Sequence, residues 1–250
     1  VQVGGVRRAS CISLSDLDSQ NMCKAKHGNW YEKNPQRSMA NNSAVYEERP
    51  SVELFMDEWL SLVESRSGER GIFNREAIIK AAPSRRKKVK FLTNPCAEIV
   101  LRPFGLCNLS MTILRGNETE EEIINRVRAA TYFGVLQSCA TTFGYVRPDW
   151  KINAESERLL GVDIMGHLDH HLLRPDAVGR EELVTKLKQA VHEVAVDLSQ
   201  RFNINLSAAN TCLKPGGDSS VLFNTTSLAP YFSQHQIRRT RESINSSVCQ

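Results

Sequence analysis

Two stretches, Asn94-Pro95-Cys96-Ala97-Glu98 and Leu106-Cys107-Asn108-Leu109-Ser110, place a thiol, a carboxylate and an amide close together and add a second thiol eleven residues after the first. Pro95 favours an extended backbone in the residue before it. Side chains two residues apart on an extended backbone project to the same side, so Asn94, Cys96 and Glu98 are predicted to face one substrate. An isolated Cys-x-Glu is more often a buried thiol beside a surface carboxylate, so this stretch alone does not define a site.

The composition is that of a globular protein, because 41% of the 250 residues are hydrophobic and the formal charge is only +4. The sequence shows no apolar run of membrane-spanning length and no secretory signal, so neither a membrane nor secretion is expected. Seven cysteines at irregular spacings then indicate reduced thiols in the cytoplasm and not a disulfide framework. The basic cluster Arg85-Arg86-Lys87-Lys88 has no interleaved aromatic residues, so it predicts a solvated loop and no nucleic-acid partner.

Apolar periodicity predicts three long helices, over 51–67, 117–140 and 180–201. Asn117 followed by Glu120 resembles a capping box at the start of the second helix. Short apolar runs predict strands at 6–14, 90–92, 99–101, 159–165 and 220–223, while 28–46 is predicted to be mostly loop. Strands that alternate with long helices indicate an α/β architecture.

The other cysteines and the histidines favour structural roles. Cys11, Cys139 and Cys212 are predicted to be small core residues, and Cys23 and Cys249 lie in polar surroundings without a partner signal. His167, His170 and His171 do not have the spacing of a zinc helix, so they are predicted to lie on a helix or loop surface with no bound metal.

Several further motifs occur in order around the central stretch. Read together, they resemble the catalytic subunit of ribonucleotide reductases, with the adenosylcobalamin-dependent (class II) type most similar. The motifs that carry the resemblance are Gly4-Gly5-Val6-Arg7-Arg8, Gln36-Arg37-Ser38-Met39-Ala40-Asn41-Asn42-Ser43, Gly68-Glu69-Arg70-Gly71-Ile72-Phe73-Asn74, Asn94-Pro95-Cys96-Ala97-Glu98, Cys107-Asn108-Leu109, Arg147-Pro148-Asp149-Trp150, Arg158-Leu159-Leu160-Gly161-Val162 with Gly166, Lys214-Pro215-Gly216-Gly217-Asp218-Ser219-Ser220 and Ile237-Arg238-Arg239.

The resemblance implies a fold and an extent. The family folds as a ten-stranded α/β barrel with a central finger loop, and Cys96 would lie on that loop. Residues 1–250 would be a single portion of this catalytic barrel domain, with the upstream redox strand and the C-terminal tail outside it.

The resemblance also implies the reduction of ribonucleotides to 2′-deoxyribonucleotides for DNA precursor synthesis. Cys96 would become a thiyl radical that abstracts the 3′ hydrogen of the ribose, Glu98 would act as general base on the 3′ hydroxyl, and Asn94 would hydrogen-bond the sugar. Cys107 would be one of two thiols that form a disulfide during the reaction, and the family places the other upstream of residue 1 in this chain.

The stretch from Lys214 to Ser220 resembles the family's phosphate-binding loop, so Gly216, Gly217, Ser219 and Ser220 would bind the substrate phosphates. It departs from the family pattern in having Gly216 in place of Ser and Asp218 in place of Thr. Outside the family context the same residues predict a simple turn.

The implied cofactor is adenosylcobalamin, and the implied partners are a ribonucleotide, nucleotide effectors and a thioredoxin-like or small-dithiol reductant. The sequence shows no separate cobalamin motif, so a class that uses a separate radical-generating subunit also stays open. Two further alternatives concern the function itself. One is a catalytically inactive nucleotide-binding fragment of the same fold, and the other is a thiol-dependent redox or metal scaffold.

Overall fold

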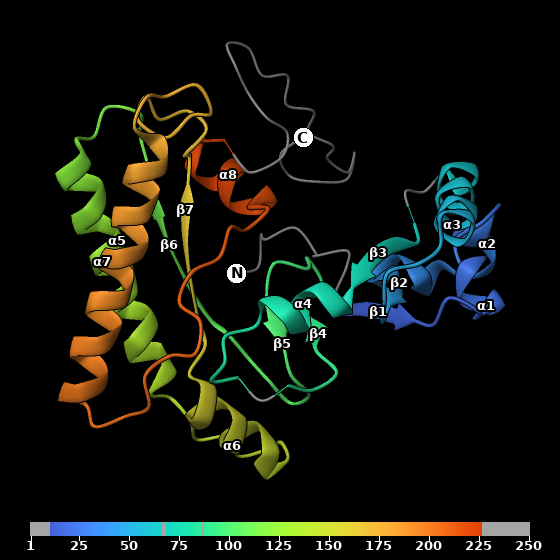
Figure 1. Cartoon of the computed structure of the whole chain (residues 1–250), viewed down its shortest axis with the longest axis horizontal. Helices are drawn as coiled ribbons and strands as arrows, with labels where there is room; N and C mark the ends of the chain where they lie inside the picture. The colour runs from blue at the N-terminus through green and yellow to red at the C-terminus, as the bar shows by residue number, and fades with distance from the viewer. Residues whose placement is uncertain (1–10, 67–68, 87, 227–250) are drawn as a thin grey trace, which may run out of the picture.

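The computed structural model describes residues 11–66, 69–86 and 88–226, and these form a mixed α/β structure (Figure 1). Three small groups of strands follow one another along the chain, in the order β1-β2-β3, then β4-β5, then β6-β7. Within the described residues, no helix combines the length and the apolar character needed to cross a membrane.

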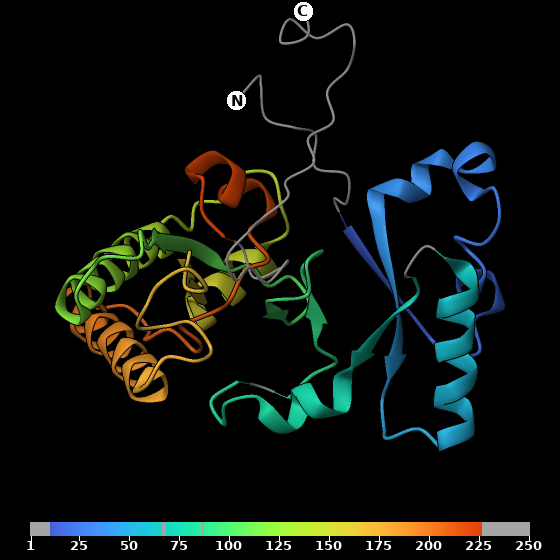
Figure 2. The same cartoon turned by 90° about the horizontal axis from the view of Figure 1, so that it is seen from above.

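The first group is a parallel sheet of β1 (Cys11–Ser15), β2 (Ala40–Tyr46) and β3 (Gly71–Asn74). Parallel neighbours need crossover connections. The first crossover holds α1 (Gln20–Cys23), α2 (Trp30–Lys33) and the 3-10 helix η1 (Pro35–Met39). The second holds α3 (Val52–Ser65), which lies alongside the sheet (Figure 2).

Arg70 links α3 to the end of β1 through its hydrogen bonds. The side chain is almost fully buried, forms a bidentate ion pair with Glu58 of α3, and donates from Nη1 to Ser15 Oγ over 3.2 Å. It also donates to the carbonyl oxygens of Asp16 and Leu17, at 2.9 and 2.8 Å. A guanidinium can satisfy all of these acceptors because its donors fan out in one plane.

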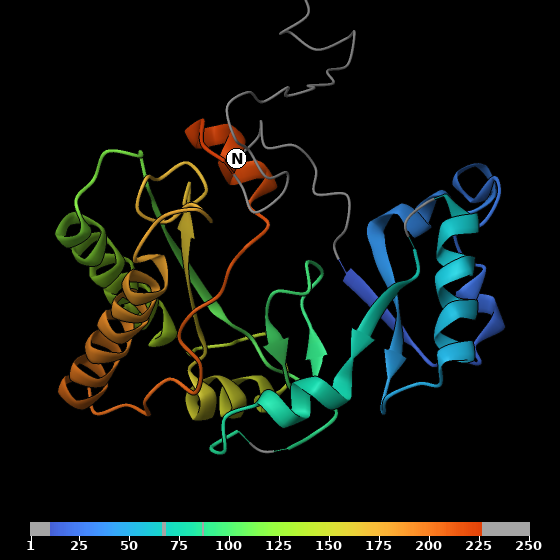
Figure 3. The ribbon, with the colours of Figure 1, turned by 45° about the horizontal axis from the view of Figure 1, so that its top comes forward.

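The second group is a short antiparallel hairpin of β4 (Leu92–Thr93) and β5 (Val100–Leu101), which follows α4 (Arg75–Ala81). It lies between the two larger parts of the chain (Figure 3). Asn41 of β2 donates from Nδ2 to the carbonyl oxygen of Pro95 at 2.5 Å, so the tip of the hairpin contacts the first sheet directly.

The third group contains the largest core. The strands β6 (Asn108–Ile113) and β7 (Leu160–Met165) are parallel, with Asn108 opposite Leu160. The helices α5 (Glu120–Ser138) and α7 (Arg180–Arg201) pack side by side over them (Figure 1). Burial of each large aliphatic side chain here contributes roughly 1.5–3 kcal/mol. The buried core residues are Leu114, Ile123, Val127, Ala130, Val135, Leu160, Val162, Leu173, Leu183, Leu187, Val191, Ala195 and Leu198.

Two more helices complete the described chain, α6 (Pro148–Glu157) and α8 (Gly217–Phe223). The prediction of a strand at 220–223 is therefore wrong, because Gly216 and Gly217 begin a helical turn that continues through it. The prediction of mostly loop over 28–46 is wrong at its end, where β2 pairs with strands on both sides.

The three long helices are confirmed with adjusted ends. The capping box of α5 uses Thr119 with Glu122, two residues later than the sequence predicted. Ser51 caps α3 by accepting from the backbone N–H of Leu54. The first predicted strand is observed over Cys11–Ser15, and its predicted residues 6–10 lie outside the described part.

Candidate functional site

The stretch Asn94–Glu98 forms the turn at the tip of the β4-β5 hairpin. Ala97 N–H donates to the carbonyl oxygen of Asn94 over 2.9 Å, and Asn94 Oδ1 accepts from the backbone N–H of Ile99 at 3.0 Å. Thr93 Oγ1 donates to the carbonyl oxygen of Ile99 at 2.9 Å. The side chain of Asn94 thus holds the turn closed.

The turn does not have the extended backbone that the sequence predicted. Ala97 has φ +65°, in the left-handed region, so the period-two argument for Cys96 and Glu98 is wrong here. The two side chains differ in environment: Cys96 is exposed, whereas the side chain of Glu98 is only 6% exposed.

Glu98 and Cys107 line the same pocket, which has a volume of about 260 Å³. Arg86, Leu160 and Thr211 also line it. The Oε2 atom of Glu98 is buried and accepts no hydrogen bond from a protein group. A buried carboxylate oxygen without a donor is costly, so a ligand with a hydroxyl group would find an acceptor at this position.

Lys214 provides the positive charge nearest to Glu98, with its Nζ atom 3.8 Å from Glu98 Oε1. The backbone N–H of Lys214 donates to Oδ1 of Asp163 at 3.1 Å, and Asp163 is fully buried on β7. Burial raises the pKa of Asp163. The backbone N–H groups of Lys214 and Ile164 and the charge of Lys214 act in the opposite direction. Asp163 of β7 therefore fixes the backbone at Lys214, whose side chain approaches Glu98.

Cys107 and Cys212 lie on either side of Gly161. A Cβ atom built on Gly161 would be 3.1 Å from Cys212 Sγ and 3.3 Å from Cys107 Sγ. Burial raises the pKa of each thiol to about 12. Cys212 adds to this effect on Cys107, and Asp163 adds to it on Cys212. Cys212 was predicted to be only a core residue, and instead it lies half-buried beside the candidate reducing thiol.

Arg86 lines the same pocket as Cys107. Its Nε and Nη2 atoms donate to the two carboxylate oxygens of Glu157, at 2.8 and 3.1 Å, and both side chains are buried. Arg102 approaches the same carboxylate at 3.6 Å, and Arg86 also lies over the ring of Phe91. The sequence placed Arg86 in a solvated loop, and that prediction is wrong because Glu157 and Phe91 bury it.

The predicted phosphate loop leads into α8. Gly216 has φ +64°, and a Cβ on Gly217 would meet no atom within 4 Å, so the backbone there is open to a ligand. Ser220 is buried with its Oγ donating to the carbonyl oxygen of Gly217 at 3.0 Å, whereas Ser219 is half-buried. Asp218 is exposed.

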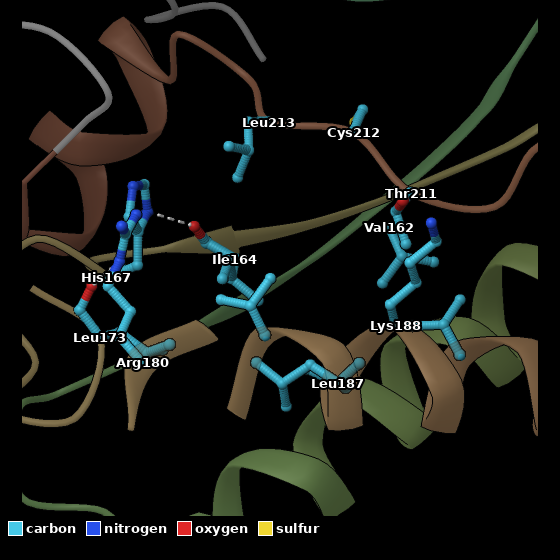
Figure 4. A pocket seen from close by; sticks show the side chains of 13 residues that line it. Val162, Ile164, His167, Leu173, Arg180, Leu187, Lys188, Thr211, Cys212 and Leu213 are labelled. Carbon is cyan, nitrogen blue, oxygen red and sulfur yellow. Dashed lines mark hydrogen bonds between the residues drawn. The ribbon is translucent and has the colours of Figure 1, made fainter. Parts of the chain in front are cut away.

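A larger pocket of about 410 Å³ lies between β7, α7 and the segment 211–213 (Figure 4). Its walls are mostly aliphatic, from residues such as Ile164 and Leu187, with Cys212 and Lys188 among the polar members. His167 also lines it and is held by an Nδ1 contact of 3.0 Å to the carbonyl oxygen of Ile164.

The histidines are not on the surface as predicted, with the exception of His171. His167 is buried, and His170 is fully buried with its Nε2 atom 3.6 Å from Glu118. His170 Nδ1 accepts from the backbone N–H of Leu172, so the ring is part of the local packing. Among the residues that the structure describes, no group of three or more His, Cys, Asp or Glu side chains could hold a metal ion.

Two other cysteine predictions are also wrong. Cys11 and Cys139 are exposed, Cys11 at the start of β1, which pairs with β2 alone within the described residues, and Cys139 at the end of α5. Cys23 is half-buried with its Sγ 3.4 Å from Ser61 Oγ. Cys249 lies outside the described residues.

Sequence reasoning missed three members of the site: Arg86, Cys212 and Lys214. The available signal was the spacing Cys212-x-Lys214 immediately before the glycine loop, which puts a second thiol and a cation next to the predicted phosphate site. For Arg86 no sequence signal separates it from its basic neighbours.

Comparison with solved structures shows the fold of ribonucleotide reductase subunits. A B12-dependent (class II) ribonucleotide reductase matches over 86% of this chain with a TM-score of 0.67 and 20% identity. The alpha subunit of the class Id ribonucleotide reductase of Actinobacillus ureae matches over 86% with a TM-score of 0.63 and 13% identity. The chain spans 33% and 48% of the length of these two proteins.

No protein-family model matches the chain, and no curated protein matches it in sequence. The prediction of an α/β chain is confirmed, and its fold is that of part of a ribonucleotide reductase catalytic subunit.

Proposed function

We propose that this chain carries the radical site of an enzyme that reduces ribonucleotides to 2′-deoxyribonucleotides. The observation that carries the proposal is the pocket that the buried carboxylate of Glu98 shares with the thiol of Cys107, two residues along the turn from the exposed Cys96. The fold shared with two ribonucleotide reductases supports the same reading.

Three side chains of the turn have separate roles in the proposed reaction. Cys96, as a thiyl radical, takes the hydrogen atom from C3′ of the ribose and returns it at the end. Glu98 accepts the 3′ hydroxyl proton on its unpartnered Oε2 atom. Asn94 holds the turn through Oδ1, so its amide nitrogen is the group proposed to donate to the sugar.

The reduction itself needs two thiols. Two S–H groups and the C2′–OH group become one disulfide, one C2′–H bond and one water molecule, which balances two electrons and two protons. Cys107 is one of these thiols. A thioredoxin-like protein or a small dithiol then restores the pair by thiol–disulfide exchange.

The substrate phosphates are proposed to bind at Gly216, Gly217, Ser219 and Ser220. The open backbone at Gly217 and the nearby ammonium of Lys214 support this placement, and the exposed position of Asp218 lets its carboxylate turn to solvent. Nucleotide effectors are proposed to act outside this loop.

Adenosylcobalamin is the proposed cofactor and would supply the initiating radical. The exposed position of Cys96 on the turn at the tip of the hairpin fits the approach of a bulky group.

The test is deoxyribonucleotide formation by Cys96→Ser, with Cys139→Ser as the matched change of an exposed thiol. We expect Cys96→Ser to abolish product and Cys139→Ser to retain it, each assayed with adenosylcobalamin and a dithiol. Steady-state turnover by Cys96→Ser would refute the radical role of Cys96. Nucleotide binding without turnover by the unmodified chain would favour the inactive nucleotide-binding alternative.

A further inference from the structure

The larger pocket, between β7, α7 and the segment 211–213, takes no part in the proposed reduction of ribonucleotides. Its volume of about 410 Å³ lies within the range of roughly 300–1,000 Å³ that is usual for small-molecule sites. Val162 and Ile164 line it from one face of β7, whereas Asp163 between them points to the other face. Among the described residues, this pocket shares only Thr211 with the pocket of the proposed active site, so the two are separate.

Aliphatic side chains form most of the walls of this pocket. Ile164 of β7 and Leu187 of α7 approach it from opposite sides (Figure 4). Val184 and Leu213 also line it and are 43% and 48% exposed, so part of the apolar wall is in contact with water. Burial of an aliphatic chain against this surface is favourable, and each added methylene should tighten binding about fourfold.

Arg180 and His167 lie at one end of the pocket, and Lys188 lies at the other (Figure 4). Arg180 donates from Nε to the carbonyl oxygen of Leu173 at 2.9 Å, which orients the guanidinium. The imidazole of His167 is held by its Nδ1 contact of 3.0 Å to the carbonyl oxygen of Ile164. The Nη groups of Arg180 form no hydrogen bond with another residue in the described ranges, so they can donate to a ligand.

Arg180 and Lys188 have no counter-charge in the pocket. Within the described part of the chain, the lining residues include no Asp or Glu. Neither cation forms an ion pair with a described residue, whereas Lys186, on the same helix, pairs with Glu120 and Glu182 outside the pocket. A cation beside an apolar wall loses hydration that an anionic partner can replace. The charge of the pocket therefore favours an anionic ligand over a neutral or cationic one.

We propose that this pocket binds a medium-chain aliphatic carboxylate. The carboxylate lies at Arg180 and His167, and the chain follows the apolar walls of β7 and α7 toward Thr211. The planar fork of one guanidinium matches the two oxygens of a carboxylate. The wall of α7 extends from Arg180 to Val191, about 16 Å along the helix axis, which is long enough for the extended chain of decanoate. Lys188 is exposed, so its ammonium can remain in water beside the end of the chain.

Calorimetric titration of the whole protein with ligands of one chain length tests the head group. Decanoate, decanol and decyltrimethylammonium have the same apolar chain and differ in charge. We expect decanoate to bind at one site and at least about tenfold more tightly than the other two, because it alone accepts charged hydrogen bonds. Octanoate, which is shorter by two methylenes, should bind about sixteenfold more weakly than decanoate. Equal affinities for decanoate and decanol, or no binding of decanoate, would overturn the proposal.

Arg180→Gln tests the position of the head group, with Arg174→Gln as the matched control. Arg174 is exposed, approaches Asp176 at 3.3 Å and does not line the pocket. Arg180→Gln should remove the preference for decanoate over decanol and leave the affinity for decanol nearly unchanged, whereas Arg174→Gln should keep the preference. Because the readout is a ratio of two affinities, a general loss of folded protein does not mimic it. A preference that survives Arg180→Gln, or that is lost only in Lys188→Gln, would overturn the placement of the carboxylate.

A photoreactive analogue of decanoate, with a diazirine at the end of its chain, locates the site directly. We expect labelled peptides from α7 or from the segment 211–213, and excess decanoate should suppress the labelling. Val184→Gln, which places a polar group in the half-exposed wall, should weaken the labelling. Labelling confined to other parts of the protein would overturn the assignment to this pocket. No ribonucleotide is present in any of these measurements, so failure of this proposal leaves the proposed reductase function untouched, and the reverse also holds.

Discussion

The buried ion pair between Arg86 and Glu157 offers the sharpest test of how the pocket is held. Glu157→Gln removes the negative charge and keeps the size and one hydrogen-bond acceptor of the side chain. Arg86 and Arg102 then remain close together with no carboxylate between them, and Arg86 stays buried against Phe91. We expect the variant to lose stability and to loosen the wall of the pocket that contains Cys107.

The magnitude follows from the burial of both partners. The side chains of Arg86 and Glu157 are 4% and 6% exposed. Removing one partner of a buried pair costs about 3–5 kcal/mol, because the other charge is left without compensation. The retained amide oxygen of the glutamine places the expected loss at about 3 kcal/mol. For a chain of this size, that corresponds to a fall in Tm of about 6–12 °C.

The assay is thermal and urea unfolding of the chain, with Glu182→Gln as the matched control. Glu182 pairs with Lys186 on α7 at 3.0 Å, but both side chains are largely exposed. An exposed pair of this kind contributes at most about 1 kcal/mol, so the control should change little. If Glu157→Gln and Glu182→Gln lose the same small amount, the buried pair does not hold this wall, and the argument from burial fails.

Two further predictions concern the turn after β7 and the buried histidine that follows it. Gly166→Ala should cost at least about 2 kcal/mol, because the position has φ +83° and a Cβ would lie 2.6 Å from the carbonyl oxygen of Leu114. Gly179→Ala is the control, with a similar φ of +78° and no atom within 4 Å, so its smaller loss in urea unfolding isolates the steric part. Burial and the adjacent His171 lower the pKa of His170, although Glu118 acts in the opposite direction. The unfolded chain therefore binds this proton first as the pH falls below about 6.5, and stability is lost through that range. The slope of unfolding free energy against pH should flatten in His170→Asn and stay unchanged when the exposed His192 is replaced by Asn; equal slopes in all three proteins would contradict the assignment.

The long helices could be predicted from the sequence because each carries its own signal. The apolar residues of α5 and α7 recur at helical spacing, and their buried faces pack against β6 and β7 as that pattern requires. The strands that were missed carry no such signal. In β2, the buried Asn42 donates from Nδ2 to the carbonyl oxygen of Met22, and its N–H donates to Glu69. A buried polar residue that donates hydrogen bonds to distant partners looks like loop in the sequence.

The site residues could likewise be predicted only where they carry a local sequence signal. The ordered motifs identified Cys96, Glu98 and Cys107 as candidates, but their surroundings depend on contacts that the local sequence does not encode. The left-handed Ala97 separates the environments of Cys96 and Glu98. The approach of Cys212 to Cys107 depends on the pairing of β6 with β7, in which residues about fifty positions apart lie opposite each other.

Gly161 connects the fold of this site to its chemistry. The parallel pairing of β6 and β7 places Leu109 opposite Gly161, and a Cβ at residue 161 would lie 2.4 Å from Leu109 Cδ2. That contact alone could be relieved by rotation of the leucine, because it involves the end of a flexible side chain. The two sulfur atoms leave less freedom, since Cys212 is fixed by its backbone bond to Val162 and Cys107 lies directly before β6. A side chain at residue 161 would therefore crowd both sulfur atoms as well as Leu109. Glycine is therefore favoured at residue 161 by the close approach of three neighbouring side chains, Leu109, Cys107 and Cys212.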